Sequence, residues 1–170
     1  MVLHFLHAVA NEKGEGWAKV HAFTFGTRLT NISRHLMRRD VDQALAAAGA
    51  EAQDWSGGTR IGECLHVFNR DWSRRVMGPG AVVLLITDGL ERGDPAQLGR
   101  EMERLGLSAR RVIWLNPLMR WDGFAPKAAG IVAMKATTVP LRASSKPEKR
   151  ASDLYDLGRL LVAGGLRPAD

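Results

Sequence analysis

The sequence has little cysteine and tyrosine and no long apolar run. Its 170 residues include one cysteine, Cys64, so no disulfide can form within the chain, and such a chain suits a reducing compartment. No apolar run approaches the ~20 residues that a membrane-spanning helix needs. The first residues lack the basic region and the small-residue cleavage site of a signal peptide. We therefore expect a cytoplasmic protein without a membrane span.

Motifs of several enzyme classes are also missing. The glycine-containing loop at 54–63 has no P-loop lysine, which argues against nucleotide binding. No residue pattern indicates a nucleophile beside its base. His4 and His7 have the spacing of a helical metal pair, but the sequence offers no third ligand near them. We expect a protein that is not an enzyme.

The composition is that of an ordinary globular domain. Apolar residues make up 45% and charged residues 25% of the chain, which are typical values, and the length suffices for one domain with a core. The net charge of +6 is compatible with acidic partners or nucleic acid. The tryptophans are not interleaved with the basic residues as in an RNA-stacking surface, which disfavours nucleic acid.

The most informative stretch is Ala81–Asp94, AVVLLITDGLERGD. Six apolar residues indicate a strand buried on both faces, as in the middle of a parallel sheet. The strand ends at Thr87-Asp88-Gly89, and ligands of open α/β sheets bind beyond the carboxyl ends of the strands. Asp88 is therefore a candidate site residue. Its alternative role is that of an ordinary turn or capping residue.

Helices and strands alternate around this stretch, which predicts an α/β, doubly wound, mostly parallel sheet. Apolar residues at helical spacing predict a helix already under way at residue 1. Further along we expect strands at Trp17–Phe25, Leu29–Ile32 and Arg111–Leu115. We expect one helix at Val41–Ala52, capped by Asp40, and a second along an apolar stripe from Ile61 to Val76. A third helix should run from Pro95 to about Leu105 and end at Gly106.

The signals weaken after Pro126. A short strand is expected within Ile131–Val139, a linker at Pro140–Arg150 and a short amphipathic helix at Asp153–Val162. We therefore divide the chain into a domain at 1–134 and an atypical C-terminal segment at 135–170.

A second loop is expected to meet Asp88 at the top of the sheet. It carries Ser56, Gly57, Gly58 and Thr59 before a helix. Hydroxyl and carboxylate oxygens suit a hard cation such as Mg²⁺. Two alternatives remain open: the loop caps its helix, or it cradles a phosphate at the helix N-terminus. Glu63, just after this loop, is expected to support Thr59 or to stabilise the helix dipole.

Four segments in order resemble a known family: AFTFGTRLT at Ala22–Thr30, DWSGGTRIGE at Asp54–Glu63, ITDGLERGDP at Ile86–Pro95 and RVIWLNP at Arg111–Pro117. The chain resembles von Willebrand factor A (VWA) domains of the CoxE-like branch, over roughly residues 1–128. The resemblance implies a metal-ion-dependent adhesion site (MIDAS), in which Thr59 and Asp88 match two of the metal ligands and Ser56, Gly57, Gly58 and Gly89 belong to the supporting loops.

The chain departs from this family at its first strand. The Asp-x-Ser-x-Ser loop that supplies three ligands in the family does not occur in the 170 residues. The domain is thus expected to lack its N-terminal strand and to hold an incomplete MIDAS, with weak or no Mg²⁺ binding. The strands beside the missing one would have unpaired edges, so we expect a marginal, aggregating or oligomeric protein.

The resemblance implies a function in protein interaction. CoxE-like proteins are accessory factors that work with a MoxR-type AAA+ ATPase in the maturation of a metalloenzyme such as carbon monoxide dehydrogenase. We expect the same of this chain: a non-enzymatic module whose partners are that ATPase and its client. The alternatives are a basic VWA module that binds nucleic acid and a truncated remnant without function.

Overall fold

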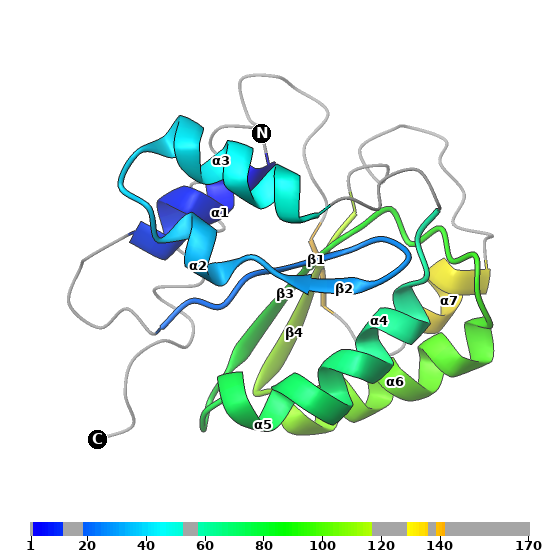
Figure 1. The fold of residues 1–170 in the computed structure, drawn as a ribbon. Coiled ribbons are helices and arrows are strands. Elements are labelled where there is room, and N and C mark those ends of the chain that lie inside the picture. The colour runs from blue at the N-terminus through cyan, green and yellow to red at the C-terminus, as the bar shows by residue number, and fades with distance from the viewer. Residues whose placement is uncertain (1, 12–18, 53–57, 117–128, 136–138, 142–170) are drawn as a thin grey trace.

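The computed structural model describes residues 2–11, 19–52, 58–116, 129–135 and 139–141 (Figure 1). Helices and strands follow one another along most of this length, as expected for an α/β chain. In order they are α1 (Val2–Asn11), β1 (Phe23–Phe25), β2 (Leu29–Asn31), α2 (Ser33–Leu36), α3 (Val41–Glu51), α4 (Ile61–Val67), the π-helical turn η1 (Phe68–Trp72), α5 (Ser73–Val76), β3 (Val82–Ile86), α6 (Pro95–Ser108), β4 (Arg111–Leu115), α7 (Ala129–Lys135) and β5 (Val139–Leu141).

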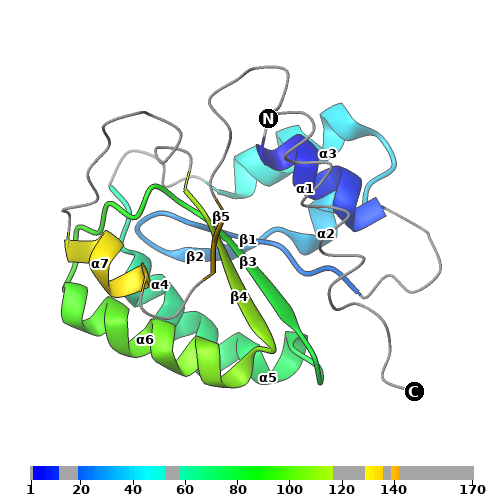
Figure 2. The ribbon, with the colours of Figure 1, turned by 180° about the vertical axis from the view of Figure 1, so that it is seen from behind.

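The strands form two separate sheets. β1 and β2 make an antiparallel hairpin, and β3, β4 and β5 make a parallel sheet with β4 in the middle (Figure 2). Val82 pairs with Arg111 and Ile86 with Leu115, while Ile113 pairs with Val139. This parallel sheet, with helices packed against it, confirms the expected α/β fold.

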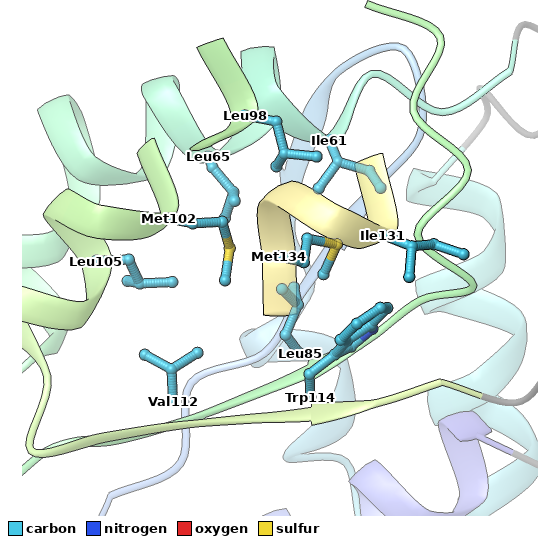
Figure 3. Close-up of a cluster of buried hydrophobic side chains, with 10 residues drawn as sticks. All are labelled: Ile61, Leu65, Leu85, Leu98, Met102, Leu105, Val112, Trp114, Ile131 and Met134. Atoms are coloured by element: carbon cyan, nitrogen blue, oxygen red, sulfur yellow. The ribbon is translucent and has the colours of Figure 1, made fainter. Parts of the chain in front are cut away.

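The main core lies between one face of the parallel sheet and helices α4, α6 and α7. Trp114 is fully buried there, and its indole N–H donates to the carbonyl oxygen of Thr87 at 2.9 Å. Figure 3 shows the side chains of this cluster converging from β3 and β4 and from the three helices: Ile61, Leu65, Leu85, Leu98, Met102, Leu105, Val112, Trp114, Ile131 and Met134.

The first three helices form a second cluster, which includes Ile32 and Leu36 and is covered by Leu3 and Leu6 of α1. Figure 1 shows these helices grouped together, apart from α4, α6 and α7. Helix α1 also sends Phe5 to the face of the parallel sheet opposite the main core, where it packs in the cluster around Ile113. The predicted helix at the start of the chain is therefore confirmed, and it joins two parts of the structure.

The predicted helix starts are confirmed by their caps. Asp40 accepts a hydrogen bond from the Gln43 amide at 2.8 Å, and Asp94 accepts from the Ala96 amide at 2.9 Å, with Pro95 at the first helical position. The predicted end of α6 at Gly106 is wrong. The helix runs to Ser108, and the Ala109 amide donates to the carbonyl oxygen of Leu105 at 3.0 Å, so Gly106 lies inside the last turn, where glycine costs only about 1 kcal/mol.

Three other expectations need correction. The strand expected within Ile131–Val139 is wrong for its first part, because residues 131–135 belong to helix α7, while 139–141 form strand β5. Ile131 and Met134 are one helical turn apart, and both enter the core. A short apolar run in the sequence fits a buried helix as well as a strand. The strand expected at Trp17–Phe25 covers only Phe23–Phe25 among the described residues. The single helix expected from Ile61 to Val76 is interrupted by η1.

A polar network joins α4 and η1 to α6. The carboxylate of Glu101, whose side chain is 7% exposed, accepts hydrogen bonds from Asn69 at 2.8 Å and Arg104 at 3.3 Å and contacts His66 at 2.9 Å. Burial raises the pKa of Glu101, but the hydrogen bonds from Asn69 and His66 and the charge of Arg104 outweigh it, so the pKa lies below its ordinary value. The charged carboxylate therefore stabilises the packing of these helices.

No helix in the described ranges combines the length and the apolar composition needed to cross a bilayer. The linker expected at Pro140–Arg150 is wrong at its start, because Pro140 and Leu141 belong to β5, which pairs with β4. The rest of it, 142–150, lies outside the described residues, as do the helix expected at Asp153–Val162 and Ser56 and Gly57 of the candidate site.

Candidate functional site

The two predicted site loops follow elements that the core holds in place. One loop, Gly58–Arg60, leads into α4, whose first residue, Ile61, is fully buried. The other, Thr87–Asp94, leads from the carboxyl end of β3 into α6. The carboxyl edge of a parallel sheet is where α/β domains bind ligands, so the position of the loops agrees with the prediction.

Backbone and side-chain hydrogen bonds join the two loops. The Arg92 amide donates to the carbonyl oxygen of Thr59 at 3.2 Å. The carboxylate of Glu91 accepts from the Gly62 amide at 2.8 Å with one oxygen and from the Gly93 amide with the other. Thr59 and the loop of Asp88 are thus brought together, as the sequence predicted.

Asp88 is half-buried, and hydrogen bonds hold both its side chain and its backbone in place. Its side chain accepts from the Leu90 amide at 3.0 Å, and its backbone oxygen accepts from the Asn116 side chain at 2.9 Å. The next residue, Gly89, has a φ of +78°, and a Cβ there would lie 2.9 Å from Trp114. Asp88 therefore acts as a turn residue, the alternative given above, while standing at the candidate site.

The loop of Thr59 also depends on a glycine. Gly58 has a φ of +80°, and a Cβ there would lie 2.5 Å from Cδ of Arg92, so the Arg92 side chain packs directly on this glycine. The loop is anchored on its far side by the Arg60 amide, which donates to the carbonyl oxygen of Gly26 at 2.9 Å. Thr59 is half-buried between these contacts.

Helix α4 is capped by a residue that the sequence analysis did not single out. Its N-cap residue, Arg60, makes no side-chain capping bond, and Glu91 from the other loop accepts from the Gly62 amide instead. Glu63, expected to support Thr59, lies 3.3 Å from Arg60 in an exposed ion pair. No local spacing identifies Glu91, because the helix end that it caps lies 29 residues earlier in the chain.

The described residues do not form a complete magnesium site. Thr59 and Asp88 offer a hydroxyl and a carboxylate as oxygen ligands, which is fewer than the near-octahedral coordination of Mg²⁺ requires. Within the described part of the chain, no three histidine, cysteine, aspartate or glutamate residues gather as a metal cluster. The cationic side chain of Arg92 packs on Gly58, next to Thr59, and its charge opposes a cation at this place.

Cys64 is on α4, near the candidate site, but it is not a reactive thiol. Its side chain is buried, and burial raises the pKa of the thiol to about 11 despite a contact with the carbonyl oxygen of Gly26 at 3.8 Å. A thiol with such a pKa is almost wholly protonated at neutral pH and a poor nucleophile. It is a small core residue, as predicted.

Comparison with known protein families places the chain. The profile of a family described as VWA domain containing CoxE-like protein matches residues 1–149. This range contains both loops of the candidate site and every strand of the described structure. No curated protein matches the chain, and neither does any solved structure.

Proposed function

The chain belongs to the CoxE-like family of VWA domains, and we propose from this that it is a non-enzymatic protein-interaction module. Its role is that of an accessory factor that works with a MoxR-type AAA+ ATPase in the maturation of a metalloenzyme such as carbon monoxide dehydrogenase. The edge formed by the loops of Thr59 and Asp88 is the surface that binds the partner.

The observation that carries this proposal is the joining of the two loops. Arg92 and Glu91 tie the Asp88 loop to the backbone at Thr59 and Gly62, so the edge is held rigid by the core beneath it. Leu90, between Asp88 and the arginine, is 49% exposed. A rigid edge that presents an apolar side chain between an acidic and a basic one suits the recognition of a protein surface.

A divalent cation, when bound, would supply an electrostatic bridge between this edge and a carboxylate of the partner. Thr59 and Asp88 are the residues that would hold it. Because they provide too few oxygens for Mg²⁺ and Arg92 opposes it, we expect weak binding to the chain alone. Calorimetry with Mg²⁺ or Mn²⁺ tests this, and tight one-to-one binding that disappears in Asp88→Ala would contradict it.

The interaction is tested with a MoxR-type ATPase from the same organism and three variants of the chain. Asp88→Asn keeps an oxygen for the Leu90 amide and removes only the charge. Thr59→Val keeps the shape and removes the hydroxyl. Asp42→Asn, an exposed position on α3, is the matched control.

We expect Asp88→Asn and Thr59→Val each to weaken binding about tenfold or more, which corresponds to the ~1.4 kcal/mol loss of one good polar contact. Asp42→Asn should bind like the unchanged chain. Equal binding by all variants would overturn the placement of the interface. Binding to single-stranded RNA that falls steeply with salt, in place of binding to the ATPase, would favour the nucleic-acid alternative.

A further inference from the structure

A basic surface lies at the amino end of the parallel sheet, at the opposite end of β3 from the candidate site. Two segments meet there: the end of α5 with the turn into β3, and the end of α6 with the start of β4 (Figures 1 and 2). The Arg110 amide donates to the carbonyl oxygen of Ala81 at 2.9 Å, and Val82 pairs with Arg111. Residues 70–82 and 101–111 thus form one region, which we call the amino-end surface.

The charge of this surface is positive and is carried by arginine alone. Over residues 70–82 and 101–111, six arginines stand against three acidic residues, and there is no lysine. Five of the arginines lie where the two segments meet, and all five are exposed: Arg74, Arg75, Arg104, Arg110 and Arg111. Neither 72–87 nor 104–116 contains an aspartate or a glutamate.

The acidic residues that flank these segments do not neutralise the surface. Asp71 pairs with Arg70 at 2.7 Å, and Glu101 contacts Arg104 at 3.3 Å, so each of these carboxylates is matched by an arginine of its own. Glu103 is the other acidic residue of α6, and it is exposed. The surface therefore keeps a net positive charge.

Stabilisation of helix ends explains only part of this charge. The carboxyl end of a helix carries about half a negative charge, which a nearby cation stabilises. Helices α5 and α6 both end at this surface, so together they compensate about one arginine. Arg74 and Arg75 lie in the last turn of α5, but Arg111 belongs to β4. Most of the charge is available to a partner of opposite sign.

An apolar side chain stands among the arginines. Leu107, in the last turn of α6, is 84% exposed, more than any other large apolar side chain in the described part of the chain. It lies one helical turn after Arg104 and three residues before Arg110. A single exposed leucine is common on protein surfaces. An apolar residue surrounded by arginine, without lysine, has the composition of a protein-binding surface.

A nucleic acid suits this surface less well than a protein does. The aromatic residues Phe68 and Trp72 of η1 are half-buried and pack edge to face on Phe23, with ring centroids 5.3 and 5.2 Å apart. They are therefore not free to stack on bases, and a phosphate backbone offers no apolar contact for Leu107. The chain beyond residue 141 has six basic and four acidic residues, so its charge has the same sign as the surface.

We propose that the amino-end surface binds an acidic, amphipathic segment of a partner protein. Carboxylates of this segment accept paired hydrogen bonds from the guanidinium groups of Arg74, Arg75 and Arg111, as arginine and carboxylate geometry allows. An apolar side chain of the segment packs on Leu107. Because the candidate site lies at the other end of β3, the chain can hold this partner while the candidate site holds another.

Fluorescence anisotropy tests the proposal with a labelled peptide of repeating Glu-Glu-Leu units. We expect the peptide to bind at low salt and to bind less tightly as salt rises, because exposed charge pairs are screened. A Gln-Gln-Leu peptide should not bind. Arg74→Glu, Arg111→Glu and Leu107→Ser should each weaken binding about fivefold or more. Arg39→Glu makes the same change of net charge at an exposed position before α3, and it should bind like the unchanged chain.

Three results would overturn the proposal. One is the absence of peptide binding at low salt. Another is an equal loss in Arg39→Glu, which would show that net charge alone attracts the peptide. The third is tighter binding of a labelled oligothymidylate than of the peptide, lost in Arg74→Glu and Arg111→Glu, which would assign the surface to nucleic acid. If circular dichroism shows that a charge reversal disturbs the fold, Arg74→Gln and Arg111→Gln take its place, and unchanged binding by both would overturn the proposal.

Discussion

Replacement of Glu91 by alanine should loosen the candidate site and lower the stability of the whole domain. The carboxylate accepts from the amides of Gly62 and Gly93, and Gly62 is buried. With the carboxylate removed, the Gly62 amide loses this acceptor, and a buried N–H without a partner costs about 1–3 kcal/mol. The loss at the half-buried Gly93 amide is smaller.

Together these losses amount to about 2–4 kcal/mol, since hydrogen bonds to a charged group are stronger than neutral ones. At about 2–4 °C per kcal/mol for a chain of this size, the melting temperature should fall by about 4–16 °C. Glu91→Gln retains one acceptor oxygen but turns an amide N–H₂ toward the other donor. Its effect should lie between those of alanine and the unchanged residue.

Thermal unfolding followed by circular dichroism measures this, with Glu63→Ala as the matched control. Glu63 lies at the same end of α4, but its ion pair with Arg60 is about half exposed on both sides, and such pairs contribute about 0–1 kcal/mol. If Glu91→Ala and Glu63→Ala melted at the same temperature, the role of Glu91 as a clamp between the loops would be refuted.

Three further predictions concern the core. Cys64 should react slowly with iodoacetamide at pH 8 in the folded protein and rapidly in urea, because its pKa is raised to about 11 by burial; equal rates would contradict its burial. Glu101→Gln should destabilise the domain by about 1–3 kcal/mol at pH 7. Because the folded pKa of Glu101 lies below the ordinary 4.5, the stabilisation by its charge is present above pH 4.5 and is lost as the pH falls through the folded pKa. Urea unfolding should therefore show a smaller difference in stability between the variant and the unchanged chain at pH 3 than at pH 7. Gly89→Ala should cost about 1–3 kcal/mol, since alanine strains the left-handed φ and its Cβ meets Trp114 at 2.9 Å; an unchanged melting temperature would contradict this.

Local signals in the sequence predicted the elements that such signals control. Asp40 and Asp94 are strong N-caps, and the aliphatic run at 82–86 is long enough to indicate a strand, so these elements lie where they were expected. The expected position of that strand in the middle of the sheet, buried on both faces, is wrong for the described residues: β4 is the middle strand, and only Leu85 of β3 is buried. The stretch from Ile131 to Lys135 is short, and its helical state follows from the fit of Ile131 and Met134 into the core. Tertiary packing decides such a segment, and no local pattern reveals it.

In the candidate site, too, some residues could be predicted from the sequence and others depend on the tertiary fold. A carboxylate after a buried strand and a threonine before a helix could be placed at one edge from the chain order alone, and the hydrogen bond between Arg92 and Thr59 brings their loops together. Glu91 could not be found in this way. Its function depends on the helix end that the fold places opposite it, and the nearer Glu63 was the more obvious candidate in the sequence.

The most direct test of the proposed function is to map where the partner binds. Amide hydrogen exchange of the chain, measured with and without a MoxR-type ATPase, reports the protected backbone. The proposal predicts protection at Gly58–Gly62 and Asp88–Gly93, with α3 unchanged. Protection confined to α2 and α3, or no protection at saturating ATPase, would contradict the assignment of this edge as the partner-binding surface.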